Sequence, residues 1–351
     1  MTGKAEKIWS RNPLKALLLA TMLGAGIGGA SAQDGAFLIV AGPQSAVFVD
    51  AISTAVQKKT DAPKPIVQVN STAGGAEAFC RGHGPQYPSV LLASRALTAG
   101  EIERCAQAGV TEILEGQLGF FAQVLIQKRS DPPLKLSTYN IYSAFAAETP
   151  RGDGLEPNKV STWKNVNGGL PQNPIKLFLT SPALGSRLVF DAEAMADGCR
   201  EVKTIKLIFR AEYRTRKCIT LRKDVVVEED NTEKRLAAIK SAPPGAIGLV
   251  SYDVYLKNKD WAALVDINGA TPSPESVAKE EYTMTTPLYI IAKKPTKDAV
   301  VTRQRLFDWM TQALSEQAIG SDGYLSALGL MALPSAQREA QRRSLTNMAK
   351  K

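Results

Sequence analysis

The residue types that this sequence has little of limit the chemistry it can perform. There is a single histidine, His83, in a turn rich in glycine and proline. No G-x-S-x-G, P-loop or H-E-x-x-H motif occurs, so a nucleophile–histidine triad would have to use His83. The four cysteines form no C-x-x-C pair, which argues against a metal site. We therefore expect neither an enzyme, nor a cofactor, nor a bound metal, and we interpret His83 as an exposed loop residue.

Two further features that the sequence lacks limit the kinds of binding partner that can be expected. The chain carries a formal net charge of +9, but it has no arginine-rich tract and no interleaving of aromatic and basic residues. Nucleic acid is therefore not an expected partner. The charge is scattered along the chain, as on an ordinary surface, although a basic surface also steers anions. Beyond the amino-terminal region, no apolar run approaches the roughly 20 residues that span a bilayer.

The first residues have the pattern of a secretory signal peptide. Lys4, Lys7, Arg11 and Lys15 flank the start of an apolar run that ends in Ala30-Ser31-Ala32. A basic region, a short apolar core and an A-x-A site predict cleavage near Gln33. The apolar core is too short to cross a bilayer, and no cysteine beside the site suggests a lipid anchor. We expect a signal peptide over residues 1–32 and an exported protein.

Strands and helices alternate along the rest of the chain. A helix over 45–58 should present Val49, Ile52 and Val56 to the core. Such alternation predicts an α/β fold with mainly parallel sheets covered on both faces, and residues 33–351 are enough for two lobes. The polar tail over 336–351 is expected to fray. The predicted strands are 37–41, 66–69, 90–93, 111–115, 119–127, 175–179 and 286–292.

Four loops at the carboxyl ends of predicted strands suit an anion, because ligands of open α/β sheets bind there. They span 42–45, 71–75, 94–95 and 181–187, and three of them precede helices whose first N–H groups lack partners. Arg95 and Arg187 can contact an oxyanion in bidentate fashion. A Thr98–Glu101 capping box should follow the third loop. The candidate ligand-binding residues are Ser45, Thr72, Ser94, Arg95, Gly185, Ser186 and Arg187.

Several segments occur in an order that resembles one family. They are NSTAGGAEAFC at 70–80, ASR at 93–95, a second cysteine at 105, TWKNVN at 162–167, GSR at 185–187, GC at 198–199 and GSDGYLSALGLMALP at 320–334. The pattern resembles the periplasmic phosphate-binding proteins of ABC phosphate importers. The resemblance extends over nearly the whole chain after the signal peptide.

The resemblance implies a two-lobed fold of the type II periplasmic-binding-protein class, with multiple crossovers between the lobes. Lobe 1 would comprise 33–118 plus 284–351, and lobe 2 would comprise 119–283. Four cysteines allow three pairings; the family favours Cys80 with Cys105 and Cys199 with Cys218. An oxidising compartment suits such disulfides. The implied protein is a periplasmic monomer that captures inorganic phosphate or a related oxyanion for an inner-membrane ABC permease.

The sequence departs from the family in two binding loops. Pro43 removes a backbone donor from the first loop, and Leu184 stands where the family has a hydroxyl residue. Fewer donors would weaken phosphate binding or alter selectivity. The alternative function is therefore a degenerate or altered-specificity oxyanion binder that acts as a sensor or interaction protein.

Overall fold

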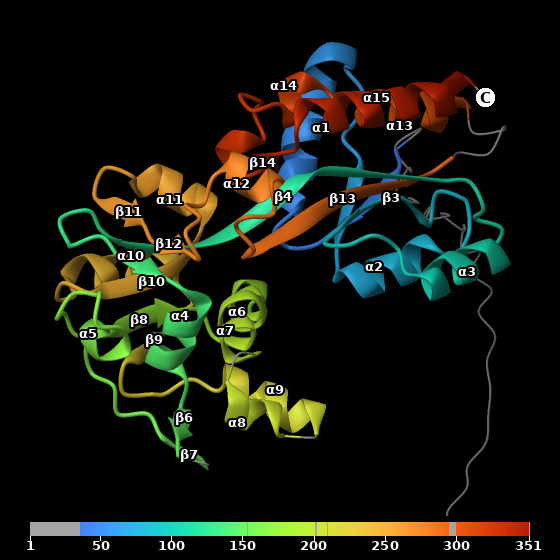
Figure 1. Cartoon of the computed structure of the whole chain (residues 1–351). Helices are drawn as coiled ribbons and strands as arrows, with labels where there is room; N and C mark the ends of the chain where they lie inside the picture. Colours follow the sequence, from blue (N-terminus) through green and yellow to red (C-terminus); the bar gives the residue numbers. More distant parts are fainter. Residues whose placement is uncertain (1–35, 153, 201, 209, 295–299, 351) are drawn as a thin grey trace, which may run out of the picture. The chain divides into compact units, whose positions relative to one another are not determined.

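The computed structural model describes residues 36–350, with the exception of 153, 201, 209 and 295–299 (Figure 1). Gly35–Lys351 forms one compact unit. The predicted signal peptide over 1–32 lies outside the described residues.

Fourteen strands are present in the described part of the chain. They are β1 (Leu38–Ala41), β2 (Ile66–Val69), β3 (Pro88–Ala93), β4 (Ile113–Lys128), β5 (Lys135–Leu136), β6 (Glu148–Arg151), β7 (Gly154–Pro157), β8 (Lys176–Leu179), β9 (Val226–Glu228), β10 (Ala246–Ser251), β11 (Ala262–Leu264), β12 (Asp266–Ile267), β13 (Thr285–Lys293) and β14 (Met331–Ala332).

Fifteen α-helices lie between and after these strands in the described residues. They are α1 (Ala46–Thr60), α2 (Thr72–Phe79), α3 (Ala99–Gln107), α4 (Thr138–Phe145), α5 (Trp163–Val166), α6 (Gly185–Phe190), α7 (Asp197–Arg200), α8 (Lys203–Lys206), α9 (Ala211–Ile219), α10 (Thr232–Ser241), α11 (Tyr252–Asn258), α12 (Pro274–Ala278), α13 (Val300–Ala313), α14 (Glu316–Ile319) and α15 (Ser335–Lys350). Asp191–Ala196 is a π-helical turn between α6 and α7, and Ser326–Leu328 is a 3₁₀ turn.

The main sheet has the strand order β2-β1-β3-β13-β4-β10-β8-β9. β1 pairs in parallel with β2 and β3, and β8 pairs in parallel with β9 and β10. In the middle, β13 is antiparallel to β3 and β4, and β4 is antiparallel to β10. The fold is therefore α/β, as predicted, with parallel ends and an antiparallel centre that Figure 1 shows as the long β4 and β13 ribbons.

β4 corrects one prediction. The segments 111–115 and 119–127 were expected as separate strands, but they belong to one strand of 16 residues. Its first half pairs with β13 and its second half with β10 and β11. A Cβ at Gly119 would lie 2.3 Å from the carbonyl oxygen of Met331. Gly119 therefore allows β14 to pair closely with β4, and it does not end the strand. The predicted strand 286–292 is confirmed as β13, which returns the chain to β3.

The buried side chains form separate hydrophobic clusters. One contains residues from Ala122 to Met284 together with Met331. The others combine residues from Phe37 to Leu118 with residues from Leu288 to Leu330. Clusters of this kind are what a fold with two lobes requires. The boundaries 33–118 plus 284–351 and 119–283 stay a prediction.

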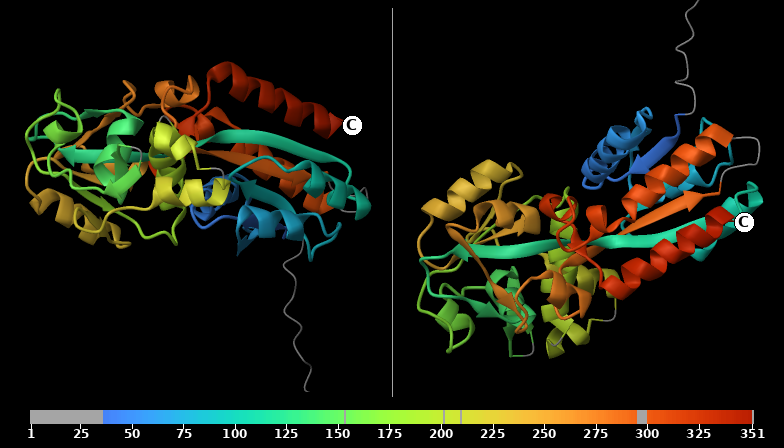
Figure 2. Two further views of the ribbon diagram at one scale, coloured as in Figure 1. Left: turned by 60° about the horizontal axis from the view of Figure 1, so that its bottom comes forward. Right: turned by 90° about the horizontal axis from the view of Figure 1, so that it is seen from above.

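Both predicted disulfides are present, Cys80–Cys105 and Cys199–Cys218. The tail, in contrast, is not frayed as expected. It forms α15, which packs along α13 and β4, and Figure 2 shows the two helices side by side. Arg338 is buried and donates to the carboxylate of Glu316 and to the carbonyl of Leu333. A polar sequence is thus held by specific charge pairing rather than by an apolar face.

Candidate functional site

The first loop connects β1 to α1 and holds Ser45. This residue is the N-cap of α1, but its side chain caps no backbone N–H. Its hydroxyl donates to the carbonyl of Gly42 at 3.1 Å, and the residue is only 4% exposed. The Ser45 hydroxyl proton therefore forms a hydrogen bond within the loop. Ser45 forms no hydrogen bond with another predicted site residue in the described structure.

The second loop was predicted over 71–75, but it is shorter because α2 begins at Thr72. Ser71 caps the helix by accepting a hydrogen bond from the N–H of Gly74 at 3.1 Å. A Cβ at Gly75 would lie 2.9 Å from the Leu91 side chain. This glycine therefore allows close packing of α2 on the sheet. The glycines that suggested an open anion loop are part of the first helical turn.

The structure brings Thr72 and Ser94 together at the carboxyl ends of β2 and β3. Their hydroxyl oxygens are 2.9 Å apart, and the Ser94 N–H donates to the Thr72 hydroxyl oxygen at 3.0 Å. Ser94 is exposed and Thr72 is half-buried. Two hydroxyls beside the start of an eight-residue helix can act as hydrogen-bond donors to an anion.

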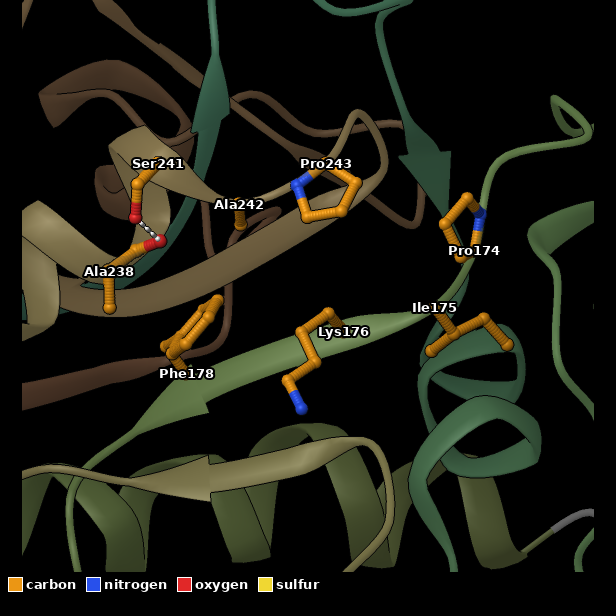
Figure 3. A pocket seen from close by; sticks show the side chains of 8 residues that line it. All are labelled: Pro174, Ile175, Lys176, Phe178, Ala238, Ser241, Ala242 and Pro243. Carbon is orange, nitrogen blue, oxygen red and sulfur yellow. Dashed lines mark hydrogen bonds between the residues drawn. The ribbon is translucent and has the colours of Figure 1, made fainter.

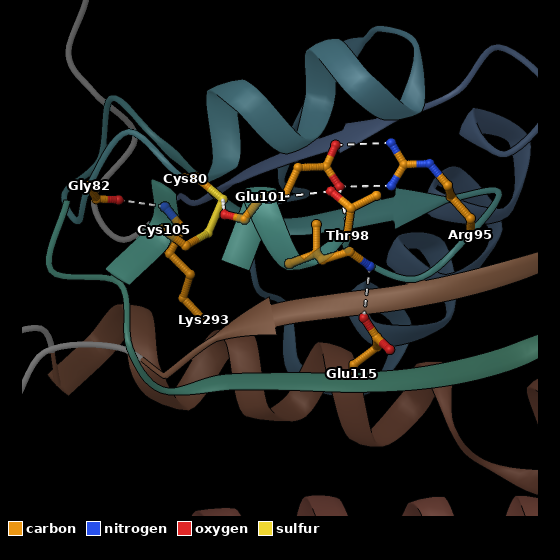
Figure 4. Close-up of a disulfide and its surroundings, with 9 residues drawn as sticks. Cys80, Gly82, Arg95, Thr98, Glu101, Cys105, Glu115 and Lys293 are labelled. Atoms are coloured by element: carbon orange, nitrogen blue, oxygen red, sulfur yellow. Dashed lines mark hydrogen bonds and ion pairs between the residues drawn. A yellow bond between two sulfur atoms is a disulfide. The ribbon is translucent and has the colours of Figure 1, made fainter. Parts of the chain in front are cut away.

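Arg95 follows directly, but its guanidinium is engaged by a carboxylate (Figure 4). Nη1 and Nη2 donate to the two oxygens of Glu101 at 2.7 and 2.9 Å. Glu101 also accepts from the N–H of Thr98 at 2.8 Å, which confirms the predicted capping box of α3. The hydrogen bonds from Arg95 lower the pKa of Glu101 to about 2. Arg95 is therefore tied to the start of α3.

Gly185 and Ser186 lie at the start of α6. Ser186 and Thr180 have hydroxyl oxygens 2.8 Å apart. The N-cap residue of the helix, Leu184, offers no side-chain acceptor, and a Cβ at Gly185 would meet no atom within 4 Å. The N–H groups of Gly185 and Ser186 thus have no side-chain cap, whereas the N–H of Arg187 donates to the carbonyl of Leu184 at 3.0 Å. The preceding Ser181 is fixed by Asp230, whose carboxylate accepts from its N–H at 2.7 Å and its hydroxyl at 2.9 Å.

Arg187 is 5% exposed and bridges two carboxylates. Its Nε donates to Asp191 at 2.7 Å, and its Nη1 donates to Glu228 at 2.8 Å. Burial raises the pKa of Asp191, against the opposing effect of Arg187. The Glu228 side chain is 46% exposed, whereas that of Asp191 is 10% exposed. Breaking the ion pair with Glu228 should cost less free energy than breaking the pair with Asp191, because water can solvate the freed Glu228 carboxylate.

The predicted residues therefore fall into separate groups. Thr72, Ser94 and Arg95 adjoin β2 and β3, whereas Gly185, Ser186 and Arg187 adjoin β8 and β9. No hydrogen bond or ion pair joins these groups within residues 36–350. The carboxylates that engage the arginines were not predicted. Asp191 has a sequence signal, its i,i+4 spacing from Arg187, and Glu228 has none.

Metal sites and membrane-spanning helices are absent from the described residues. No cluster of three or more His, Cys, Asp or Glu side chains that could hold a metal occurs in them. None of their helices combines the length and apolar character that crossing a bilayer requires. A pocket of about 470 Å³ lies between β8 and the end of α10 (Figure 3). Lys176 is its only charged lining residue, and none of the predicted anion ligands borders it.

Comparison with known proteins decides the family. Residues 27–314 match the PBP superfamily domain. The chain belongs to the PBP superfamily. The phosphate-binding protein PstS of Borreliella burgdorferi is 23% identical over 261 residues, which cover 74% of this chain and 79% of that protein.

Solved structures of phosphate-binding proteins share the fold. A possible phosphate binding protein from Planctomyces limnophilus superposes with a TM-score of 0.58 at 19% identity, over 90% of this chain and 98% of that one. PstS from Borrelia burgdorferi gives a TM-score of 0.56 at 17% identity, over 85% and 99% of the two chains. The two-lobed fold predicted from the sequence is thereby confirmed.

Proposed function

We propose that this chain is a periplasmic solute-binding protein that captures inorganic phosphate and delivers it to an inner-membrane ABC permease. It binds as a monomer and performs no catalysis. The observation that carries the proposal is the pair of hydroxyls of Thr72 and Ser94, 2.9 Å apart at the start of α2. Membership of the PBP superfamily and a relative named as a phosphate-binding protein support it.

Binding of this kind needs donors rather than a reaction centre. A micromolar complex requires about 8 kcal/mol, and hydrogen bonds that involve a charged group contribute about 1.5–3 kcal/mol each. Thr72 and Ser94 would supply hydroxyl donors. The open start of α6 at Gly185 and Ser186 would supply backbone N–H groups. Arg95 and Arg187 would supply the positive charge, and Ser45 would shape the first loop.

Carboxylates beside both arginines give the proposal a specific consequence. Glu101 and Glu228 already neutralise part of the charge on Arg95 and Arg187, so a doubly charged anion competes with them. A carboxylate can accept a hydrogen bond from an anion that still carries a proton. Monoprotonated phosphate and arsenate can donate that hydrogen bond, whereas fully ionised sulfate cannot. We therefore expect phosphate and arsenate to bind more tightly than sulfate.

Calorimetric titration of the dialysed protein, starting at Gln33, with phosphate, arsenate and sulfate tests the proposal. Phosphate should bind at micromolar concentration or below, and Arg95→Ala and Arg187→Ala should each weaken it by about a hundredfold or more, since each leaves a carboxylate uncompensated. Lys257→Ala removes an equal charge from an exposed position on α11 and should change little. If no oxyanion binds, the alternative of a degenerate binder acting as a sensor or interaction protein replaces the proposal.

A further inference from the structure

A strongly basic segment of the chain takes no part in the proposed phosphate site. It lies between the second pair of cysteines, over 203–217, and contains six lysines and arginines but one acidic residue, Glu212. The basic residues are Lys203, Lys206, Arg210, Arg214, Arg216 and Lys217. The remainder of the chain has its charges mixed, so this concentration of one sign is local.

The segment is preformed. It contains α8 and α9, which pack against each other, and α9 packs against the π-helical turn Asp191–Ala196. The disulfide Cys199–Cys218 closes it at its base. Figure 1 shows α8 and α9 next to α6 and α7, at the lower edge of the view. Because the disulfide and the packing hold α8 and α9, binding does not require these helices to fold, and only the exposed side chains lose conformational freedom.

Three of the cations have no partner in the described structure. Lys203, Arg210 and Arg216 are exposed, and no hydrogen bond or ion pair engages them within residues 36–350. Other basic residues nearby are occupied, since Arg214 donates to a backbone carbonyl and Lys217 pairs with Glu148. Arg210 and Arg216 also line a hollow of about 350 Å³ together with Tyr213 and the single acidic residue Glu212. These unpaired guanidinium groups can donate hydrogen bonds to the oxygens of an external phosphate group.

Two exposed apolar side chains belong to the same segment as these cations. Leu207 is 74% exposed and Tyr213 is 45% exposed. Leu207, between α8 and α9, is the most exposed large hydrophobic residue in the described part of the chain. Basic residues beside an exposed aliphatic and an aromatic side chain are typical of surfaces that lie on a membrane interface, where headgroups meet the charges and the acyl boundary receives the apolar groups.

We propose that Lys203, Leu207, Arg210, Tyr213 and Arg216, here called the α8–α9 surface, bind an anionic phospholipid bilayer peripherally. Anionic headgroups complement the three unpaired cations, and Leu207 enters the interface beside them. The attraction acts within a Debye length and weakens with salt. None of these residues belongs to the proposed oxyanion site, so this inference does not depend on phosphate binding.

Co-sedimentation with vesicles tests the proposal on the protein that starts at Gln33, which retains the compact unit from Gly35 onward. Vesicles of phosphatidylglycerol mixed with phosphatidylcholine should bind it, and pure phosphatidylcholine vesicles should not. Each cation near such a surface changes affinity by about fivefold, so the triple variant K203Q/R210Q/R216Q should bind about a hundredfold more weakly. Leu207→Ser should bind several-fold more weakly at unchanged charge.

The matched control is K58Q/K135Q/K234Q, which removes three exposed positive charges from α1, β5 and α10. This control variant should keep most of the vesicle binding. Both triple variants should match the parent in phosphate affinity and in thermal unfolding. Three results would overturn the proposal: no vesicle binding by the parent, equal loss in the two triple variants, or undiminished binding by K203Q/R210Q/R216Q. Retention on immobilised polyglutamate without vesicle binding would assign the surface to an acidic protein instead.

Discussion

Arg95 and Arg187 occupy corresponding places, each in or just after a loop that leaves a strand, yet the protein holds them differently. Arg95 is 40% exposed at its side chain and pairs with Glu101, which also caps α3. Arg187 is 6% exposed and joins Asp191 on its own helical segment to Glu228 on β9. The first pair belongs to a helix terminus. The two contacts of Arg187 differ: Asp191 is nearly buried on the same helical segment, whereas the half-exposed Glu228 connects Arg187 to β9.

The difference shows what each arginine contributes. Water solvates the half-exposed Arg95 but not Glu101, whose side chain is 6% exposed, so this pair should contribute more than the roughly 0–1 kcal/mol of a fully solvated pair and less than a fully buried one. Removing one member of a buried pair costs about 3–5 kcal/mol because the other charge stays unpaired in the interior. Arg187 is therefore expected to matter for stability as well as for anion binding, whereas Arg95 is expected to contribute less to stability than Arg187 does.

The largest effect is expected at Arg187. Arg187→Ala leaves the nearly buried carboxylate of Asp191 without its partner, so urea denaturation should give a free energy of unfolding lower by about 3–5 kcal/mol. Phosphate binding should fall by about a hundredfold or more in the same variant. A loss of stability below about 1 kcal/mol would show that the buried pair is no stronger than the one at Arg95.

A double variant separates the two consequences. Arg187→Met with Asp191→Leu removes both charges and keeps apolar volume, which often restores the stability of a broken buried pair. This protein should regain most of the free energy of unfolding and still fail to bind phosphate. Recovery of phosphate binding would show that Arg187 is purely structural.

Low pH should reduce the stability that the ion pair between Arg95 and Glu101 contributes. The pKa of Glu101 is lowered from 4.5 to about 2 in the folded protein, so its stabilisation is present above pH 4.5 and is lost as the pH falls toward 2. We expect this loss to reach about 2 kcal/mol, after allowing for solvent around the half-exposed arginine. Glu101→Gln keeps a capping side chain but cannot titrate. Unfolding measured over this pH range should show a smaller loss for Glu101→Gln than for the parent; parallel curves would refute the assignment.

Much of the fold was predictable because it depends on local patterns. The buried face of α1, the start of β2, the capping box of α3 and both disulfides follow from spacing or family resemblance. The start of α2 was missed because Gly74 and Gly75 suggested a loop, whereas Gly75 serves contact with Leu91. The continuity of β4 was missed because Gly119 permits close pairing of β4 with β14, a strand that lies far away in the sequence.

The candidate site was less predictable than the fold. The sequence placed Thr72 and Ser94 after strands whose carboxyl ends lie at one edge of the sheet, and in the structure the two residues meet there although β1 lies between β2 and β3. The carboxylates were not foreseen. Glu228 reaches Arg187 only because β9 pairs with β8, and a pairing between distant segments leaves no periodic signal in the sequence.

The exposed partner of Arg187 provides a gain-of-function test. Glu228 must leave Nη1 before an anion can use it, and its half-exposed position keeps that competition modest. Glu228→Gln removes the competing charge at nearly constant volume, so phosphate affinity measured by calorimetry should rise by about tenfold. Glu156→Gln, an exposed carboxylate on β7 that pairs with Arg151, is the matched control and should change little. Weaker phosphate binding by Glu228→Gln would mean that Glu228 contacts the ligand directly.

The smallest effect is expected at the uncharged pair of hydroxyls. Thr72→Val keeps the shape of the side chain but removes the hydroxyl that contacts Ser94. One neutral hydrogen bond contributes about 1 kcal/mol, so phosphate affinity should fall by about fivefold. Thr72→Ser retains the hydroxyl and should bind phosphate within about twofold of the parent. If both variants bind like the parent while Arg187→Ala does not, the anion lies at Arg187 alone, and the loops after β2 and β3 do not form part of its site.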